Sequence, residues 1–133
     1  MKLIYPAIFY PFDNGEEGYT VEFPDLPGCV TEGYNLIDAF EMAADAASGW
    51  ILLELEEGKH APAASTLADI SAPDDAMVNM VVLDMDAYAE KYGSKVVRKN
   101  ITIPAWLNTF GEKNNINFSR VLSDALLKQV QEA

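Results

Sequence analysis

The amino-acid sequence predicts an α+β protein with two parts of unequal size. Three strand-like segments precede a long amphipathic helix and a further strand–helix pair, and the last forty or so residues contain one strand and two helices. The formal charge divides the chain at nearly the same point. Residues 1–94 carry eighteen acidic residues and three lysines, a charge of −15, whereas residues 95–133 carry six basic and three acidic residues, a charge of +3. We therefore expect one domain over residues 1–93 and a second over residues 94–133.

The first three predicted strands form an antiparallel meander. Residues 3–10 are rich in β-branched and aromatic side chains, residues 19–23 alternate apolar and polar, and residues 29–34 make the third strand. Two turn signals separate them. Asp-Asn-Gly at 13–15 favours a tight turn, and Pro-Asp-Leu-Pro-Gly at 24–28 removes backbone donors and ends in a glycine that permits positive φ.

The rest of the first domain alternates helix and strand. Asn35 is a favourable N-cap for a helix over residues 36–57, whose apolar side chains recur at helical spacing. Residues 58–76 contain prolines and many small residues and predict a loop. Residues 77–83 form a strongly apolar strand, expected in the interior of the sheet, and residues 84–92 form a short helix. The order is β-β-β-α-β-α, with the helices on one face of the sheet.

Composition excludes several kinds of site. The one cysteine, Cys29, allows no intrachain disulfide, and with His60 alone it cannot build a zinc site, so no metal or cofactor is expected. Cys29 is interpreted as a small buried thiol and His60 as a solvated loop residue. The acidic residues fall mostly on turns and on one helix face without a ligand motif, so we expect no enzymatic activity. No apolar run is long enough to span a membrane, which indicates a cytoplasmic protein.

The second domain begins with an alternating strand over residues 97–103. Pro104 stands at a natural helix start, and a first helix is predicted to about Lys113. Asn114 and Asn115 tolerate left-handed geometry and break this helix, and Asn117 then caps a second one.

A single strand leaves its edges unpaired, and so small a unit buries too little to fold alone. Pairing with the same strand of a second chain solves both problems and gives a two-stranded ribbon on a four-helix core. The predicted dimer core consists of Ile101, Ile103, Trp106, Leu107, Val121, Leu122 and Leu126.

Such a ribbon fits the DNA major groove, and its exposed face would carry Arg98, Asn100 and Thr102 twice. Arg suits guanine, Asn suits adenine, and Thr suits a thymine methyl group or a polar base edge. A DNA phosphate is expected at the start of the second helix, where the residues are Asn117, Phe118, Ser119 and Arg120.

This domain resembles the ribbon-helix-helix family of DNA-binding proteins. The matching segments are residues 98–104, residues 115–117 and residues 118–126. Two positions depart from the family pattern: Lys99 stands where an apolar residue is usual, and Asn115 stands where glycine is common. A purely dimerising tail without a DNA role is the alternative.

The first domain resembles the HicB antitoxin family. The resemblance lies in Pro-Asp-Leu-Pro-Gly at 24–28, within the strands of residues 19–33, followed by the Ala-rich helix over residues 36–55. It implies a degraded RNase H-like fold without catalytic carboxylates, which binds and blocks HicA, a small basic mRNA-cleaving ribonuclease. It also implies a C-terminal domain that forms a homodimer, or a larger even-numbered assembly, and represses the operon promoter.

The leading interpretation is therefore an antitoxin and autorepressor. Its acidic body captures a basic toxin, and its basic ribbon holds operator DNA. The candidate toxin-binding residues are Asp25, Asp38, Glu41 and Asp45, on the 24–28 turn and on the acidic helix face. One alternative is a stand-alone transcription factor whose first domain senses a small ligand. A metal-dependent nuclease is the third hypothesis.

Overall fold

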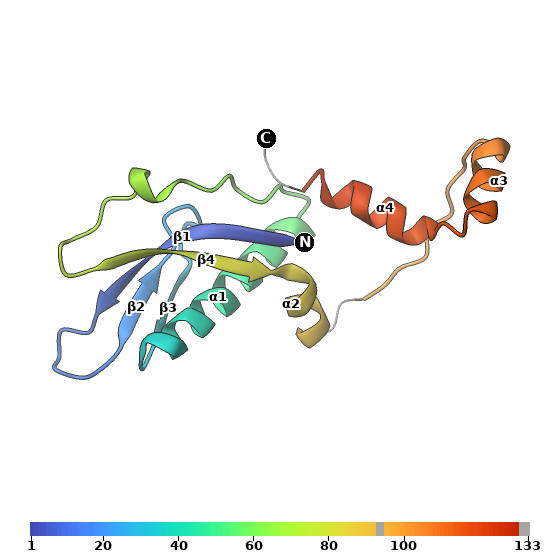
Figure 1. Ribbon diagram of the computed structural model, residues 1–133. Coiled ribbons are helices and arrows are strands. Elements are labelled where there is room, and N and C mark those ends of the chain that lie inside the picture. Colours follow the sequence, from blue (N-terminus) through green and yellow to red (C-terminus); the bar gives the residue numbers. More distant parts are fainter. Residues whose placement is uncertain (93–94, 131–133) are drawn as a thin grey trace.

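The computed structural model describes residues 1–92 and 95–130. Residues 1–92, here called the body, form a sheet with two helices. Residues 95–130, here called the C-terminal module, extend beside it, with α4 nearer the body than α3 (Figure 1). The predicted domain boundary at 93–94 lies outside the described residues.

A four-stranded antiparallel sheet forms the centre of the body. Its order is β3-β2-β1-β4, so consecutive strands β1, β2 and β3 are neighbours and the predicted meander is confirmed. The strands are β1 (Lys2–Pro11), β2 (Tyr19–Glu22), β3 (Val30–Gly33) and β4 (Met77–Asp84).

The prediction that residues 77–83 form an interior strand is wrong. Strand β4 lies at an edge of the sheet and pairs along its whole length with β1, which takes the interior place. Its apolar character has another cause. Val81 and Leu83 are buried beneath α1, and the short 3-10 turn η1 (Leu67–Asp69) lies against the strand. Side chains on both faces of this edge strand are therefore partly shielded from water.

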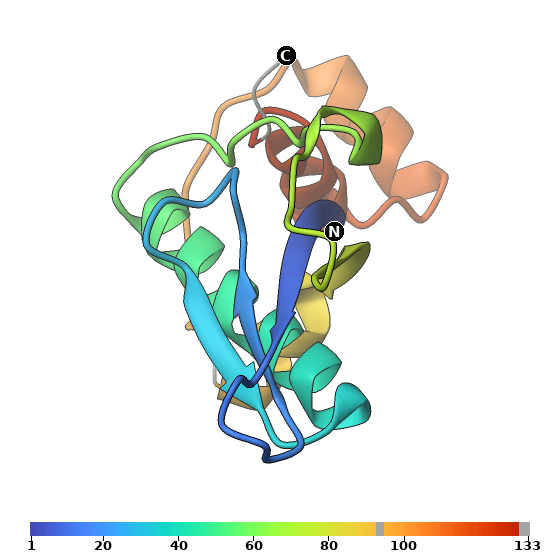
Figure 2. The ribbon, with the colours of Figure 1, turned by 90° about the vertical axis from the view of Figure 1, so that its left-hand side faces the viewer.

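Helix α1 (Leu36–Glu56) packs across one face of the sheet, as Figure 2 shows. Its alanines Ala39, Ala43 and Ala47 are fully buried, because small side chains let the helix approach the strands closely. Gly33 at the end of β3 is needed for the same reason. A Cβ atom there would lie 2.3 Å from the backbone nitrogen of Ala39.

Helix α2 (Met85–Tyr92) packs beside α1. Gly49 lies in the middle of α1, and a Cβ atom there would lie 2.9 Å from the Tyr88 hydroxyl oxygen. This glycine thus marks a close approach between two helices. The Tyr92 hydroxyl donates a 2.9 Å hydrogen bond to Asp45, which also connects α2 to α1.

The C-terminal module contains α3 (Ala105–Lys113) and α4 (Phe118–Leu127), at the predicted positions. Between them Asn115 adopts a left-handed φ of 54°, as expected for a helix-breaking asparagine. The helices meet closely, because a Cβ atom on Gly111 would lie 2.3 Å from the Phe118 ring.

The end of the module returns to the body. Val130 packs against the hydrophobic core, and its carbonyl accepts a 2.8 Å hydrogen bond from the backbone N–H of Ala61. Ala61 is itself fully buried. The module is therefore held to the body at its far end.

Candidate functional site

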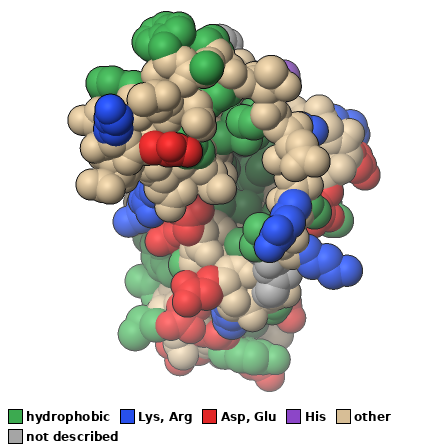
Figure 3. Space-filling model, turned by 90° about the vertical axis from the view of Figure 1, so that its right-hand side faces the viewer, with side chains coloured by type: hydrophobic (Ala, Val, Ile, Leu, Met, Phe, Trp, Pro, Cys, Tyr) green, Lys and Arg blue, Asp and Glu red, His purple; other side chains and the backbone are tan. Residues whose placement is uncertain are grey.

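The apolar face of the C-terminal module faces solvent. Trp106 is 70% exposed, Val121 56% and Leu126 58%, and Ile101, Ile103 and Leu107 are exposed as well. Figure 3 views the molecule from this side and shows hydrophobic side chains at the surface beside lysine and arginine side chains. Of the seven predicted dimer-core residues, Leu122 alone is partly buried. Soluble proteins rarely expose a contiguous apolar patch of this kind unless another surface covers it.

The predicted strand over residues 97–103 is not formed in the single chain. Residues 95–104 are neither helix nor strand, and each of them is exposed. This is the physical consequence of having no neighbour, since a strand exists only through hydrogen bonds to another one. Arg98, Asn100 and Thr102 all face solvent here. They are neither buried inside a monomer nor part of a helix, the two arrangements that would contradict a ribbon.

The four predicted phosphate-binding residues lie together at the start of α4. Asn117 caps the helix as predicted, because its side-chain oxygen accepts a 3.1 Å hydrogen bond from the Arg120 N–H. The Arg120 guanidinium lies 4.0 Å from Asp124 one turn on. The Phe118 ring is used for packing against Gly111, so only its backbone N–H is available at the helix start.

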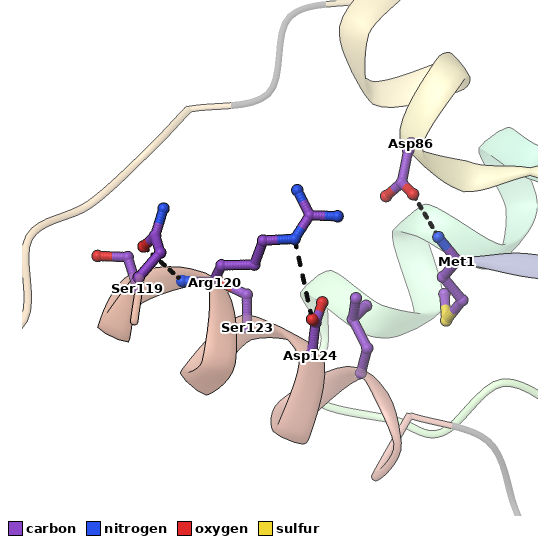
Figure 4. Close-up of a pocket in the computed structure, with 8 residues that line it drawn as sticks. Met1, Asp86, Ser119, Arg120, Ser123 and Asp124 are labelled. Carbon is purple, nitrogen blue, oxygen red and sulfur yellow. Dashed lines mark hydrogen bonds and ion pairs between the residues drawn. The ribbon is translucent and has the colours of Figure 1, made fainter. Parts of the chain in front are cut away.

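This helix start lines a cleft between the module and the body (Figure 4). Asn117, Ser119 and Arg120 form one wall, and Met1 and Asp86 belong to the other. The N-terminal ammonium of Met1 pairs with Asp86. That ion pair partly neutralises the Asp86 carboxylate, which lines the cleft opposite Arg120.

Three of the four predicted toxin-binding acids have structural partners. Asp25 accepts hydrogen bonds of 2.7 and 2.8 Å from the hydroxyl and backbone N–H of Ser65. Asp38 accepts a 2.9 Å hydrogen bond from the backbone N–H of Tyr34 at the start of α1. Asp45 accepts one from Tyr92, whereas Glu41 is exposed and makes no hydrogen bond or ion pair with any residue that the structure describes.

The structure does not gather these four acids at one place. Asp38 lines a hollow between β3 and the start of α1, whereas Glu41 and Asp45 line another between α1, β4 and α2. Asp25 belongs to the 24–28 turn. This turn lies near the other end of α1, where the Trp50 indole N–H bonds to the Pro27 carbonyl at 3.1 Å.

The 24–28 turn is built as a structural unit. Leu26 is fully buried, and its backbone N–H bonds to the Phe23 carbonyl while its carbonyl accepts from the Cys29 N–H. Gly28 has the positive φ expected from the sequence, 82°. With Asp25 holding Ser65, the turn fixes the connection between α1 and β4 against the sheet.

The two residues with possible nucleophilic or metal chemistry lie where the sequence predicts. Cys29 is buried, and burial raises the pKa of its thiol to about 11. His60 lies exposed in the connection that follows α1. Within residues 1–92 and 95–130, no three His, Cys, Asp or Glu side chains lie close enough to hold a metal ion. Among the described helices, none is both long and apolar enough to span a membrane.

Sequence reasoning missed the exposed apolar residues at the junction of β3 and α1. Tyr34 and Ile37 are each 75% exposed, and Met42 is 40% exposed. A signal was present, because Ile37 and Met42 fall outside the core-facing positions of the helix. This signal is hard to see in the sequence, because apolar residues, many of them alanines, occur around much of the helix and do not mark a single face.

The fold and its surfaces define a class of protein: an acidic α+β body joined to a helical module whose apolar side chains are exposed. A family model described as HicB-like antitoxin of bacterial toxin-antitoxin systems matches residues 5–125. The chain belongs to this family of antitoxins.

The chain is also similar to individual proteins and solved structures. An uncharacterized 14.9 kDa protein from the rep-hol intergenic region of Haemophilus phage HP1 is 30% identical over 106 residues, covering 79% of this chain and 76% of its own length. A toxin-antitoxin complex from Streptococcus pneumoniae contains a chain with 26% identity and a TM-score of 0.61, covering 97% of this chain and 99% of that one. The HicA3 and HicB3 toxin-antitoxin complex contains a chain with 25% identity and a TM-score of 0.51, covering 62% of this chain and 99% of that one.

Proposed function

We propose that this antitoxin neutralises a HicA-like mRNA-cleaving toxin through its body and represses its own operon through its C-terminal module. In this proposal residues 1–93 bind the toxin, and residues 94–133 form the homodimer and bind operator DNA. The body corresponds to the degraded RNase H-like domain, and the module to the ribbon-helix-helix domain, that the resemblances imply.

Toxin binding is supported by charge and by family membership. A body with a charge of −15 attracts a basic partner and repels nucleic acid. Two of the similar solved structures are described as toxin-antitoxin complexes. A protein that must cover the RNA-binding surface of a ribonuclease needs this sign of charge.

The observation that carries the DNA-binding part is the exposure of the module's apolar face beside an unpaired polar segment. Trp106, Val121 and Leu126 would be covered if a second module packed against them. The same association would supply the missing neighbour for residues 97–103. Two such segments paired antiparallel would present Arg98 and its polar neighbours as one ribbon for the major groove.

The start of α4 supports the same arrangement. Its unpaired backbone N–H groups and the positive end of the helix dipole favour a phosphate, and Arg120 adds a charge nearby. Because Asn117 already caps one N–H, the remaining donors of the first turn are the ones available to DNA.

Toxin neutralisation is tested by co-expressing the full antitoxin with the HicA-like product of the adjacent gene. We expect the two proteins to purify together and RNA cleavage by the toxin to cease. An antitoxin lacking residues 95–133 tests whether the body is sufficient. Separate elution of the full antitoxin and the toxin, with undiminished RNA cleavage, would refute this part of the proposal.

Operator binding is tested with a duplex from the antitoxin's own promoter and a random duplex of equal length. Arg98→Ala combined with Asn100→Ala should abolish the preference for the promoter, because the base-reading groups are lost. Arg120→Ala should weaken binding to both duplexes equally, because a phosphate contact carries no sequence information. If the double variant still prefers the promoter duplex, the ribbon does not read the bases.

A further inference from the structure

Exposed apolar side chains of the body concentrate at one place. Residues 1–92 contain ten large hydrophobic side chains that face solvent, and five of these fall between residues 30 and 42. They are Val30, Tyr34, Leu36, Ile37 and Met42. This is the junction where edge strand β3 leads into α1.

The junction is rigid, although it is exposed. The Asp38 backbone N–H donates a 2.8 Å hydrogen bond to the Asn35 side chain, and the Asp38 carboxylate accepts one from the Tyr34 backbone N–H. Gly33 brings the backbone of β3 against Ala39 at the start of the helix. A surface held in place before binding loses little conformational entropy when a partner arrives.

Part of this junction is hollow. Thr31, Glu32, Tyr34, Asn35, Asp38 and Met42 line a surface depression of about 430 Å³, here called the β3–α1 patch. Two of its residues are large and apolar in character, two are carboxylates, and none of the six is Lys or Arg. A hollow lined by apolar side chains and carboxylates suits a partner that presents Lys or Arg beside apolar side chains.

We propose that the β3–α1 patch is the docking surface for the toxin, with Tyr34 and Met42 as its apolar anchors. This inference rests on the proposed function, because the toxin is the basic protein partner. A second copy of the chain is a poor occupant, since it would bring another acidic body against Glu32 and Asp38. DNA is repelled for the same reason.

The hollow between α1, β4 and α2 fits the toxin less well. It also carries acids, but Asp45 is bonded to Tyr92, and Lys91 lies among its lining residues. A basic partner would meet a like charge there. The β3–α1 patch has no Lys or Arg among its six lining residues, although its Asp38 also accepts a hydrogen bond, from the Tyr34 backbone N–H.

The anchors are tested by Tyr34→Ala combined with Met42→Ala, with toxin binding measured by titration calorimetry. Truncating the two apolar anchors should weaken binding and raise the dissociation constant at least 30-fold. The matched control is Ile4→Ala combined with Val82→Ala. These two side chains are paired across β1 and β4, are 45% and 56% exposed, and lie away from the patch. The control should change the dissociation constant less than threefold.

The outcomes separate this inference from the proposed function. If the unaltered antitoxin does not bind the toxin, both fail. If it binds and the patch variant binds equally well, the docking surface is elsewhere while the proposed function stands. Greater weakening by the control variant would place the toxin at the Ile4–Val82 pair, beside the hollow between α1, β4 and α2 that Val82 lines. Both variants must melt at the temperature of the unaltered protein, which the exposure of all four side chains makes the expected result.

The contribution of the carboxylates in the patch is measured separately. Glu32→Lys should slow association with the toxin at low salt at least tenfold, because it reverses a charge beside the anchors. Glu56→Lys changes the net charge equally at the exposed C-terminal end of α1 and serves as control. Equal slowing by both variants would show that only the overall charge matters and would overturn the specific role of Glu32.

Discussion

In the body, Tyr5, Phe9 and Ile51 are fully buried, whereas in the C-terminal module Trp106 and Leu126 are more than half exposed. Both regions have helices with apolar side chains at helical spacing. The difference is that the body has a sheet for α1 to cover, while the module has only two short helices. An apolar pattern therefore predicts burial but does not say which surface provides it.

The largest effect should follow from Phe9→Ala, which tests whether the body closes its own core. Phe9 is fully buried, and its ring lies 4.6 Å from the Phe40 ring. Its removal should lower the free energy of unfolding by about 3–5 kcal/mol, measured by urea denaturation, without dependence on protein concentration. Ile4→Ala on the same strand is the exposed control. A loss below about 1 kcal/mol would mean that Phe9 is not part of a closed core.

Leu126→Asp tests the opposite expectation, that the module's core is completed by a second copy. A carboxylate placed in an apolar interface should raise the dimer dissociation constant at least 100-fold, about 3 kcal/mol. Sedimentation equilibrium measures this constant directly. Gln129→Asp adds the same charge at an exposed position and should have little effect. If the unaltered protein stays monomeric at millimolar concentration, no second copy covers the apolar face of the module, and the expected difference between the two regions is contradicted.

Asp25→Ala asks whether the 24–28 turn belongs to the closed body or to a partner surface. The loss of both hydrogen bonds to Ser65 should lower stability by about 1–3 kcal/mol, measured by thermal unfolding. Toxin affinity should be unchanged at temperatures where the variant is folded. Weaker toxin binding with an unaltered melting temperature would instead make Asp25 a contact residue.

The smallest effects come from the two asparagine caps, one in each region. Asn35→Ala and Asn117→Ala each remove an N-cap hydrogen bond, worth about 1 kcal/mol. The Asn35 effect should be the same at all protein concentrations. The Asn117 effect should appear chiefly in the dimer dissociation constant, because in the proposed dimer α4 packs against a second copy. If the loss of stability depends on protein concentration in the same way for both variants, then body and module do not differ in their need for a second copy.

Local patterns predicted most of the elements because local physics determines them. Asn35 and Asn117 cap their helices, Gly28 and Asn115 take positive φ, and α3 ends where the asparagines begin. Each depends on a side chain bonding within three residues or on a backbone angle that few residues tolerate. Interactions between distant residues could not be predicted in this way.

The acidic residues show where prediction from the sequence stopped. Asp25, Asp38 and Asp45 look alike as charges on turns and on a helix face. Their partners are Ser65, the Tyr34 backbone and Tyr92, and the first and last of these lie 40 and 47 residues away in the chain. A sequence pattern does not reveal whether a carboxylate is free for a partner or already bonded.

The sequence by itself determined the order of the elements, the caps and turns, and the split between an acidic body and a basic tail, because these depend on near neighbours and on composition. Only the tertiary structure decided that β4 lies at the sheet edge, that Val130 returns to the core, and that Tyr34 and Met42 border an acidic hollow. The first two arrangements join segments far apart in the chain, and their free energy comes from burial and hydrogen bonds shared between distant residues. The hollow lies within residues 31–42 and depends on how closely α1 packs against β3.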